Sequence, residues 1–327
     1  MKAKKIICAI VVFALALCSF KAALSLEFIG GGVSLRYVQP LSSAQVKTAI
    51  NYAETSKNNA LSPTFWKEST QSAYANEKSV SVTAIQYLGS ANAALAAKYI
   101  SGTAPGSGDE YGCALSAKTA NALFGSCDIQ GIEVTLLQKK YYVRGVFESR
   151  DNVCIISADE TVGFTAMDLL GTSSADRRRE AMAFAMSCGM PMPYQAVFGE
   201  SLAAIAGIIC LFPLFAIGVR TLWRLWRQSR SLSSAKRQLL LFVFALIMSL
   251  MLPLFLRAVP SWLLPSKWSD FSFWSNLIEI IKSSINEWLS IKACYRDVQI
   301  KYFLLQTTLF TALQLPFCRV MYESHKL

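Results

Sequence analysis

Four long runs of apolar residues alternate with polar segments along the chain. The uncharged runs cover residues 6–20, 201–219, 238–256 and 302–318. A helix needs about 20 apolar residues to cross the hydrocarbon core of a bilayer, and about 17 is the lower limit. The pattern therefore predicts a membrane protein with four transmembrane helices, one at the N terminus and three in the last third of the chain.

The first run has two interpretations. It follows Lys2, Lys4 and Lys5, and it ends at Lys21 before a stretch of small residues. A basic start, a short apolar core and a small-residue exit are typical of a cleavable signal peptide, whereas a short span whose flanking lysine can snorkel suits a retained anchor. We take residues 1–25 as an N-terminal transmembrane anchor, with a signal peptide as the alternative. Either interpretation predicts export of the residues that follow.

Between the first two runs the sequence favours helices and strands in turn. Some segments contain good helix formers, and others are rich in Val, Ile and Tyr and bounded by turn residues. The predicted helices are 43–56, 91–100 and 116–123, and the predicted strands are 79–87, 132–137, 141–147 and 153–157. Residues 103–111 read as a surface loop, and residues 30–32 as a glycine turn between strands. This mixture predicts an α+β extracytoplasmic domain over residues 26–199, inserted between spans one and two.

The segment before the last run has apolar residues at spacings of three and four over 273–291. Such a stripe predicts an amphipathic helix on the outer side. Because Trp262, Trp268 and Trp274 lie nearby, the helix fits the headgroup layer of the membrane, and packing against the exported domain is the alternative. With the spans around it, this helix completes a three-span transmembrane domain over 200–327.

The net charge of +11 is unevenly distributed along the chain. Residues 26–199 contain 14 basic and 15 acidic residues, which leaves 18 basic and 6 acidic residues for the rest. Basic residues gather on the cytoplasmic side of membrane proteins. The N terminus, the basic loop 220–237 and the C-terminal tail are therefore predicted to lie inside. This location favours membrane topology and lipid, and not nucleic acid, as the reason for the charge.

The sequence offers few residues for chemistry. Its only histidine is His325, so a Ser–His or Cys–His couple in the exported segment is excluded. There is no Gly-Lys dipeptide and hence no P-loop. The last three runs contain no charged residue, which disfavours an ion or proton pathway. We expect no enzymatic activity, no cofactor and no metal site.

The exported segment has four cysteines, and none of them forms a CxxC pair. They are Cys113, Cys127, Cys154 and Cys188. A disulfide between Cys113 and Cys127 is one interpretation, and buried free thiols are the other.

A short motif within residues 99–147 has a clear physical logic. Leu123 and Phe124 close the apolar face of the helix predicted at 116–123, and Gly125 permits a left-handed exit. Two strands joined near residues 138–140 then pair as a hairpin against that helix. Gly131 precedes the first strand, and the second strand contains Val143, Gly145 and Val146.

These residues resemble the extracytoplasmic core domain of MacB/FtsX-like ABC transporter permeases. In that family a helix ending in Leu-Phe-Gly is followed by a Gly, a strand, and a strand ending in Val-x-Gly-Val. The predicted order of one span, a large exported domain and three further spans is also similar. The motif covers about fifty residues, and the order of elements extends over nearly the whole chain.

The resemblance implies a permease-like subunit in a bacterial cell membrane. Such a subunit couples a separate cytoplasmic ABC ATPase to movements of the extracytoplasmic domain, for export, extraction or signalling. Its partners would be membrane lipid and the ATPase in trans, with a homodimer as a further assembly. The residues expected to contact the ATPase are Arg220, Arg224, Arg227 and Arg230 of the inner loop.

Two features depart from the family pattern. Pro191 and Pro193 interrupt the helix that would extend the second span outward. The inner loop 220–237 is short and contains no acidic residue. The alternative function is therefore a non-catalytic, membrane-anchored adaptor or assembly protein that retains the domain fold without an ATPase.

Overall fold

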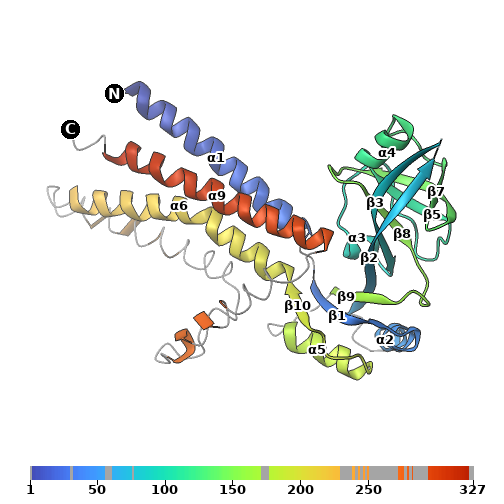
Figure 1. Ribbon diagram of the computed structural model, residues 1–327. Helices are drawn as coiled ribbons and strands as arrows, with labels where there is room; N and C mark the ends of the chain where they lie inside the picture. The colour runs from blue at the N-terminus through green and yellow to red at the C-terminus, as the bar shows by residue number, and fades with distance from the viewer. Residues whose placement is uncertain are drawn as a thin grey trace. The chain divides into compact units, whose positions relative to one another are not determined.

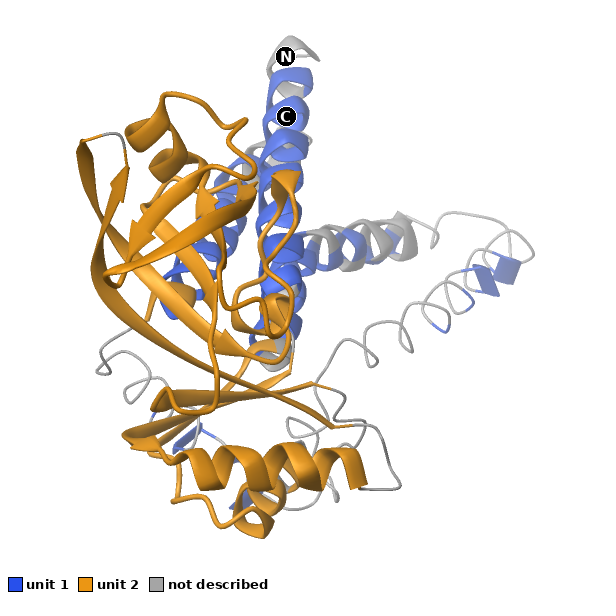
Figure 2. Ribbon diagram, turned by 90° about the vertical axis from the view of Figure 1, so that its right-hand side faces the viewer, with its two compact units in different colours: residues 1–30, 200–293, 297–327 blue, residues 31–199, 294–296 orange. Residues whose placement is uncertain are grey.

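A computed structural model of the chain divides into two compact units (Figure 2). It describes residues 2–29, 32–55, 61–75, 77–170, 177–228 and 294–323, together with short pieces between 238 and 282. Unit 1 comprises Met1–Gly30, Glu200–Ala293 and Asp297–Leu327. Unit 2 comprises Gly31–Gly199 and the three residues Cys294–Arg296.

The described part of unit 1 is formed mainly by three long helices (Figure 1). They are α1 (Lys2–Ile29), α6 (Gly199–Gln228) and α9 (Tyr295–Glu323). Leu26 of α1 and Ile300 of α9 are buried in one apolar cluster with Ala206 of α6. Ser19 of α1 also shares a 2.9 Å hydrogen bond with the hydroxyl of Thr311. The three helices therefore pack against one another near these residues.

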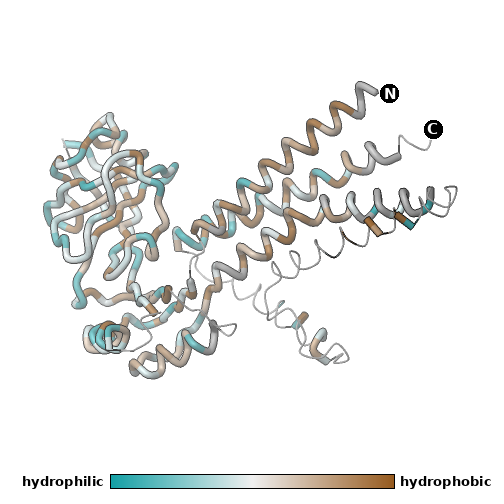
Figure 3. Tube along the Cα trace, turned by 180° about the vertical axis from the view of Figure 1, so that it is seen from behind, coloured by the Kyte–Doolittle hydropathy of each residue, from teal (hydrophilic) through white to brown (hydrophobic). Residues whose placement is uncertain are grey.

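Within the described residues, one helix is long and apolar enough to cross a membrane, over Ile6–Leu26. Figure 3 shows hydrophobic residues along most of α1. The second predicted span lies in α6, whose apolar part Leu202–Pro213 is shorter, and the fourth lies in α9. Most of the third predicted span and most of the predicted amphipathic helix 273–291 lie outside the described residues. The four-span arrangement stays a prediction.

Unit 2 is an α+β domain built on a sheet of ten strands. The strands are β1 (Val33–Leu41), β2 (Ser62–Ala75), β3 (Lys78–Leu88), β4 (Tyr99–Gly102), β5 (Gly112–Ser116), β6 (Glu133–Leu136), β7 (Lys139–Phe147), β8 (Val153–Ser157), β9 (Phe164–Leu170) and β10 (Gln195–Phe198). Their order is β10-β1-β9-β2-β3-β8-β5-β7-β4, and β6 pairs with β2 and β7. The helices are α2 (Ser43–Thr55), α3 (Ala91–Ala94), α4 (Ala117–Phe124) and α5 (Arg177–Ser187).

Two apolar clusters show how the helices cover this sheet. In the first, Val46 of α2 and Phe184 of α5 pack with Leu35 and Phe65 of the sheet. In the second, Leu123 of α4 packs with residues of β3, β5, β7 and β8. Helices α2, α4 and α5 thus each bury apolar side chains against the sheet.

The structure confirms most of the elements predicted for the exported segment. The predicted helices 43–56 and 116–123 are α2 and α4, and the four predicted strands are β3, β6, β7 and β8. The helix predicted over 91–100 is wrong, because α3 ends at Ala94 and Tyr99–Gly102 forms β4. Pairing of β4 with β7 overrides the local helix preference there.

The predicted glycine turn also differs from the structure. Helix α1 continues to Ile29, so Gly32 connects a helix to a strand and not two strands. Its φ of +81° is the left-handed conformation that favours glycine. Gly30 and Gly31 lie outside the described residues.

None of the nine cysteines forms a disulfide. The disulfide interpretation for Cys113 and Cys127 is therefore wrong. The interpretation as buried free thiols holds for Cys113, Cys154 and Cys188, but not for Cys127, which is partly exposed. Cys113 and Cys154 lie on the adjacent strands β5 and β8 and are fully buried, whereas Cys127 is partly exposed. Burial raises the pKa of Cys154 to about 12 and also raises the pKa of Cys113.

Candidate functional site

The two chain connections that flank unit 2 meet at neighbouring positions of its sheet. Strand β1 begins at Val33, shortly after α1, and β10 ends at Phe198, directly before α6. Val33 pairs with Phe198 on one side and with Leu169 of β9 on the other. The entry and the exit of the domain are therefore held together by backbone hydrogen bonds.

A third segment of the chain reaches the same part of the sheet. Cys294–Arg296 belong to unit 2, although Tyr295 and Arg296 form the start of α9. Nη1 of Arg296 donates to Oδ2 of Asp168 in β9, and to the carbonyl oxygen of Ala93 at 2.7 Å. Asp168 pairs with Ser34, the neighbour of Val33. All three connections therefore reach neighbouring positions of the sheet. The first two meet at Val33 of β1, and the third meets Asp168 of β9, which pairs with the next residue of β1, Ser34.

Tyr295 fixes this third segment from its other side. Its backbone N–H donates to both carboxylate oxygens of Glu68, at 2.9 and 2.8 Å. Its hydroxyl forms a 2.8 Å hydrogen bond with the hydroxyl of Ser149. Tyr295 and Cys294 also pack against the buried cluster around Trp66. The segment is held by polar and apolar contacts together.

We call Ser34, Arg36, Trp66, Asp168 and Arg296 the junction cluster. The carboxylate of Asp168 is fully buried and accepts hydrogen bonds from the Ser34 hydroxyl and, at 3.1 Å, from Nε1 of Trp66. Nη1 of Arg36 lies 3.9 Å from the same carboxylate, and its guanidinium stacks 4.2 Å from the centre of the Trp66 ring.

The junction cluster therefore holds one buried carboxylate between two buried guanidinium groups. Arg36 is 6% exposed and Arg296 is 4% exposed. Taking such charges out of water is costly, and only close partners and further hydrogen bonds offset the loss. Removal of the shared carboxylate would leave both arginines buried without it. The geometry suits a rigid connection between β1, β9 and the start of α9.

The motif residues lie in a different part of the domain, around α4. The hydroxyl of Ser116 caps this helix by accepting from the Thr119 N–H at 3.2 Å. Gly125 ends it with a φ of +76°, and its N–H donates to the carbonyl of Asn121 at 2.9 Å. Leu123 is fully buried beneath the helix, and Phe124 packs partly buried beside it.

The glycines of the motif serve close backbone approaches. The N–H of Gly131 donates to the carbonyl of Val143 at 2.7 Å, which joins the loop after α4 to β7. A Cβ atom on Gly145 would lie 2.5 Å from the carbonyl oxygen of Thr103, so only glycine lets β4 approach β7 here. Val143 and Val146 are buried in β7. These positions support the fold around α4.

The predicted partner surface is only partly described. Arg220, Arg224 and Arg227 lie on α6, and the side chains of Arg220 and Arg227 are exposed. Arg230 and most of the inner loop 220–237 lie outside the described residues. The contact of these arginines with an ATPase stays a prediction.

Sequence reasoning missed the junction cluster, although two local signals point to it. Asp168 is the single charge in the apolar strand Phe164–Leu170. Arg296 and Asp297 lie shortly before the fourth apolar run. Burial of charged side chains beside such a run costs free energy unless they are paired. In the described part of the chain, no three His, Cys, Asp or Glu residues lie close enough to hold a metal ion.

The sequence matches no protein-family model and no curated protein. The chain has a fold similar to the periplasmic region of MacB from Actinobacillus actinomycetemcomitans, with a TM-score of 0.43 and 10% identity over 53% of this chain and 90% of that one. It is also similar to the extracellular domain of the noncanonic ABC-type transporter YknZ from Gram-positive bacteria, with a TM-score of 0.39 and 13% identity over 50% of this chain and 99% of that one. The similarity of this chain to these two transporter domains is one of fold.

Proposed function

We propose that this chain is a permease-like subunit of an ABC transporter, in which movements of the membrane helices are passed to the extracytoplasmic domain. The observation that supports this most is the convergence of three chain connections on the junction cluster. Two of them, at Val33 and Phe198, are paired strands, and the third is the ion pair of Arg296 with Asp168. A domain joined to three helices at one point is suited to respond to all of them together.

The physical basis of this coupling is the stiffness of the connection. Packed interiors resist compression and transmit strain. Because Arg296 is part of α9, a displacement of that helix acts directly on Asp168 in the centre of β9. The neighbouring β1 and β2 pair with β9 and would move with it. Small shifts of a helix are therefore expected to reorient the sheet as one body.

The proposed topology has four transmembrane helices and places residues 26–199 outside the bacterial cell membrane. The long apolar helix over Ile6–Leu26 supports the first span. The basic residues around the other runs support an inner loop at 220–237. Labelling of substituted cysteines in intact cells tests this topology. A cysteine in place of Asn58 or Ser272 should be labelled from outside, and a cysteine in place of Ser231 should not. Labelling of Ser231 from outside would contradict the four-span arrangement.

The proposed ATPase contact rests on the basic inner loop. Arg224, Arg227 and Arg230 follow one another at spacings of three, on and beyond the end of α6. Ion pairs at a solvent-exposed surface chiefly set association rate and orientation, and each contributes about 0.2 to 1 kcal/mol. Replacement of all three arginines by Glu should therefore lower the amount of nucleotide-binding protein that co-purifies with the tagged chain. Quantitative mass spectrometry measures this amount.

A matched control separates this effect from the change in net charge. The variant Lys78→Glu, Lys118→Glu and Arg150→Glu makes the same change at three exposed positions of unit 2. It should leave the recovery unchanged. Lys236, Arg237 and the N-terminal lysines are kept in both variants, so that the basic residues that fix orientation remain.

The alternative function is an adaptor or assembly protein without a motor. The short inner loop without acidic residues favours it. If the reversed variant keeps its labelling pattern and no nucleotide-binding protein is recovered with any version of the chain, the transporter proposal fails and the adaptor takes its place.

A further inference from the structure

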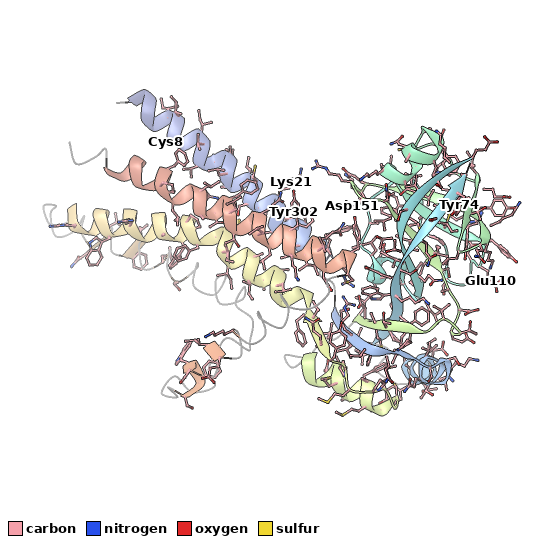
Figure 4. The ribbon with its side chains drawn as sticks, in the orientation of Figure 1. Cys8, Lys21, Tyr74, Glu110, Asp151 and Tyr302 are labelled. Carbon is pink, nitrogen blue, oxygen red and sulfur yellow. The ribbon has the colours of Figure 1, made fainter. Side chains whose placement is uncertain are left out.

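Methionines are concentrated at one place on unit 2. Four of the nine methionines of the chain lie within eleven residues, at positions 182, 186, 190 and 192. All four line one pocket of about 140 Å³, together with Ala185, Pro191 and Pro193. Figure 4 draws the side chains around α5, with sulfur in yellow.

The end of α5 creates this arrangement. The N–H of Gly189 donates to the carbonyl of Met186, and the N–H of Met190 donates to the carbonyl of Ala185, both at 3.0 Å. Gly189 has a φ of +65°. This is a Schellman cap, which folds the chain back over the last turn of a helix. Residues after the cap therefore return to the face that carries Met182 and Met186.

Packing explains only one of the four thioethers. Met190 is 8% exposed, and its sulfur accepts a 3.5 Å hydrogen bond from the hydroxyl of Tyr37. In contrast, Met186 is 67% exposed and Met192 is 77% exposed, while Met182 is half-buried at the pocket. Pro191 and Pro193 restrict the backbone on both sides of Met192. Three thioethers are thus left with room to bind a ligand.

We propose that Met182, Met186 and Met192 bind a soft monovalent metal ion, Cu(I) or Ag(I). Thioether sulfur is an uncharged, polarisable ligand, and soft ligands of this kind select Cu(I) over Mg²⁺, Ca²⁺ or Mn²⁺. The described residues that line the pocket include no carboxylate, imidazole or thiol, and so none of the ligands that those harder ions prefer. The pocket is also below the roughly 300 Å³ typical of sites for larger organic ligands.

The site does not depend on thiols or on the proposed transport function. Cys188 is buried in the core beneath α5 and is absent from the pocket lining. Thioethers do not form disulfides, so disulfide formation cannot remove these ligands. Methionine is not among the histidine, cysteine and carboxylate ligands on which the expectation of no metal site rests.

The test compares Ag⁺ binding by matched variants of the full-length chain in detergent. One variant carries Met182→Leu, Met186→Leu and Met192→Leu, and the control carries leucine at Met248, Met251 and Met321. Leucine keeps the volume and the apolar character but removes the sulfur. Accessible thiols are blocked with N-ethylmaleimide in every sample, and binding is followed through the ¹³C-labelled methionine methyl resonances.

We expect Ag⁺ to shift the three pocket resonances before the other methionine resonances, and the pocket variant to lose one equivalent of bound ion while the control loses none. The same loss should occur with Cu(I) under ascorbate. Unchanged stoichiometry in the pocket variant, or simultaneous movement of all methionine resonances, would overturn the proposal and leave an apolar docking surface as the explanation. If the triple variant does not fold, the single variants Met186→Leu and Met192→Leu at exposed positions replace it in the experiment. Each should weaken Ag⁺ binding.

Discussion

Arg296 at the start of α9 donates to Asp168 of β9, although the two residues are 128 positions apart in the chain. Both side chains are buried, with 4% of Arg296 and none of Asp168 exposed. Ser34 donates to the same carboxylate from β1. A single carboxylate therefore joins the first strand of the domain, its ninth strand and the beginning of the last helix.

Replacement of Asp168 by asparagine should strongly destabilise the domain. The change keeps the shape of the side chain but leaves Arg36 and Arg296 buried without the carboxylate. Breaking a buried ion pair in this way costs about 3–5 kcal/mol. Chemical denaturation of the full chain in detergent, followed by circular dichroism, measures the loss.

Two further variants give the comparison for Asp168→Asn. Asp151→Asn makes the same chemical change at an exposed position and should alter stability by less than about 0.5 kcal/mol (Figure 4). Arg296→Met should be milder than Asp168→Asn, because Asp168 keeps its partners Ser34, Arg36 and Trp66. Equal effects of Asp168→Asn and Asp151→Asn would show that the buried charges contribute nothing.

Alanine at Gly125 and at Gly145 should affect stability for different reasons. At Gly125 the added Cβ has no atom within 4 Å. Only the left-handed backbone conformation is then unfavourable for alanine, and it should lower the free energy of unfolding by roughly 1–2 kcal/mol. At Gly145 the Cβ would lie 2.5 Å from the oxygen and 2.7 Å from the nitrogen of Thr103. The loss there should reach about 3 kcal/mol, the upper end for overpacking.

Hydrogen exchange distinguishes the two glycine variants. The Thr103 N–H donates to the carbonyl of Arg144 at 3.2 Å, beside Gly145. Gly145→Ala should separate β4 from β7 and accelerate exchange of this amide, and Gly125→Ala should not. Equal protection of the Thr103 amide in both variants would mean that β4 tolerates the extra methyl group.

The part of the fold around α4 could be predicted from sequence because its signals are local. Ser116 marks the helix start and Gly125 its end, and both act through neighbouring backbone groups. The hairpin of β6 and β7 turns at Leu137 and Gln138, whose positive φ values of 52° and 61° fit a tight turn. Such features depend on a few adjacent residues, so a pattern in the sequence reveals them.

Elements that depend on distant partners could not be predicted in this way. The residues 95–100 favour a helix locally, yet Tyr99 pairs with Phe147 at the edge of the sheet. The junction cluster needs Arg296 to meet Asp168, and no local pattern joins them. The methionines of α5 were visible in the sequence, but only the Schellman cap brings Met192 back to Met186.

The ion pair of Asp109 with Arg144 should give a small acid dependence of stability. The hydrogen bond from Arg144 is the main reason why the pKa of Asp109 is lowered, and the two atoms Nε and Oδ2 lie 2.8 Å apart. A carboxyl with a lowered folded pKa stabilises the protein above its unfolded pKa of about 3.9 and loses that contribution as the pH falls through the folded value.

Asp109→Asn should therefore lower the free energy of unfolding at neutral pH and have little effect at strongly acid pH. Because both side chains are partly exposed, the difference should stay below about 1 kcal/mol. Denaturation at a series of pH values measures it. Added salt should reduce the difference by screening, and a difference that grows as the pH falls would contradict the assignment.

Thiol labelling tests the arrangement of the cysteines in unit 2. Cys113 and Cys154 are fully buried, and burial raises the pKa of Cys154 to about 12. Thiolates react and thiols do not, so neither residue should react with a maleimide in the native protein at pH 8. Cys127 is partly exposed and should be labelled without prior reduction, and mass spectrometry of peptides identifies the site. After unfolding in denaturant, all three should react.

The same burial gives a dependence of stability on alkaline pH. A thiol whose folded pKa is raised stabilises the protein below its unfolded pKa of about 8.5, and this contribution decreases as the pH rises toward the folded value. Stability should therefore fall between about pH 8.5 and 12, and Cys154→Ala should show a smaller fall than the parent chain. If Cys127 reacts only after reduction, it is held in a disulfide. A disulfide with Cys113 would require β5 to release Cys113 from the core, and the burial of both Cys113 and Cys154 would then be contradicted.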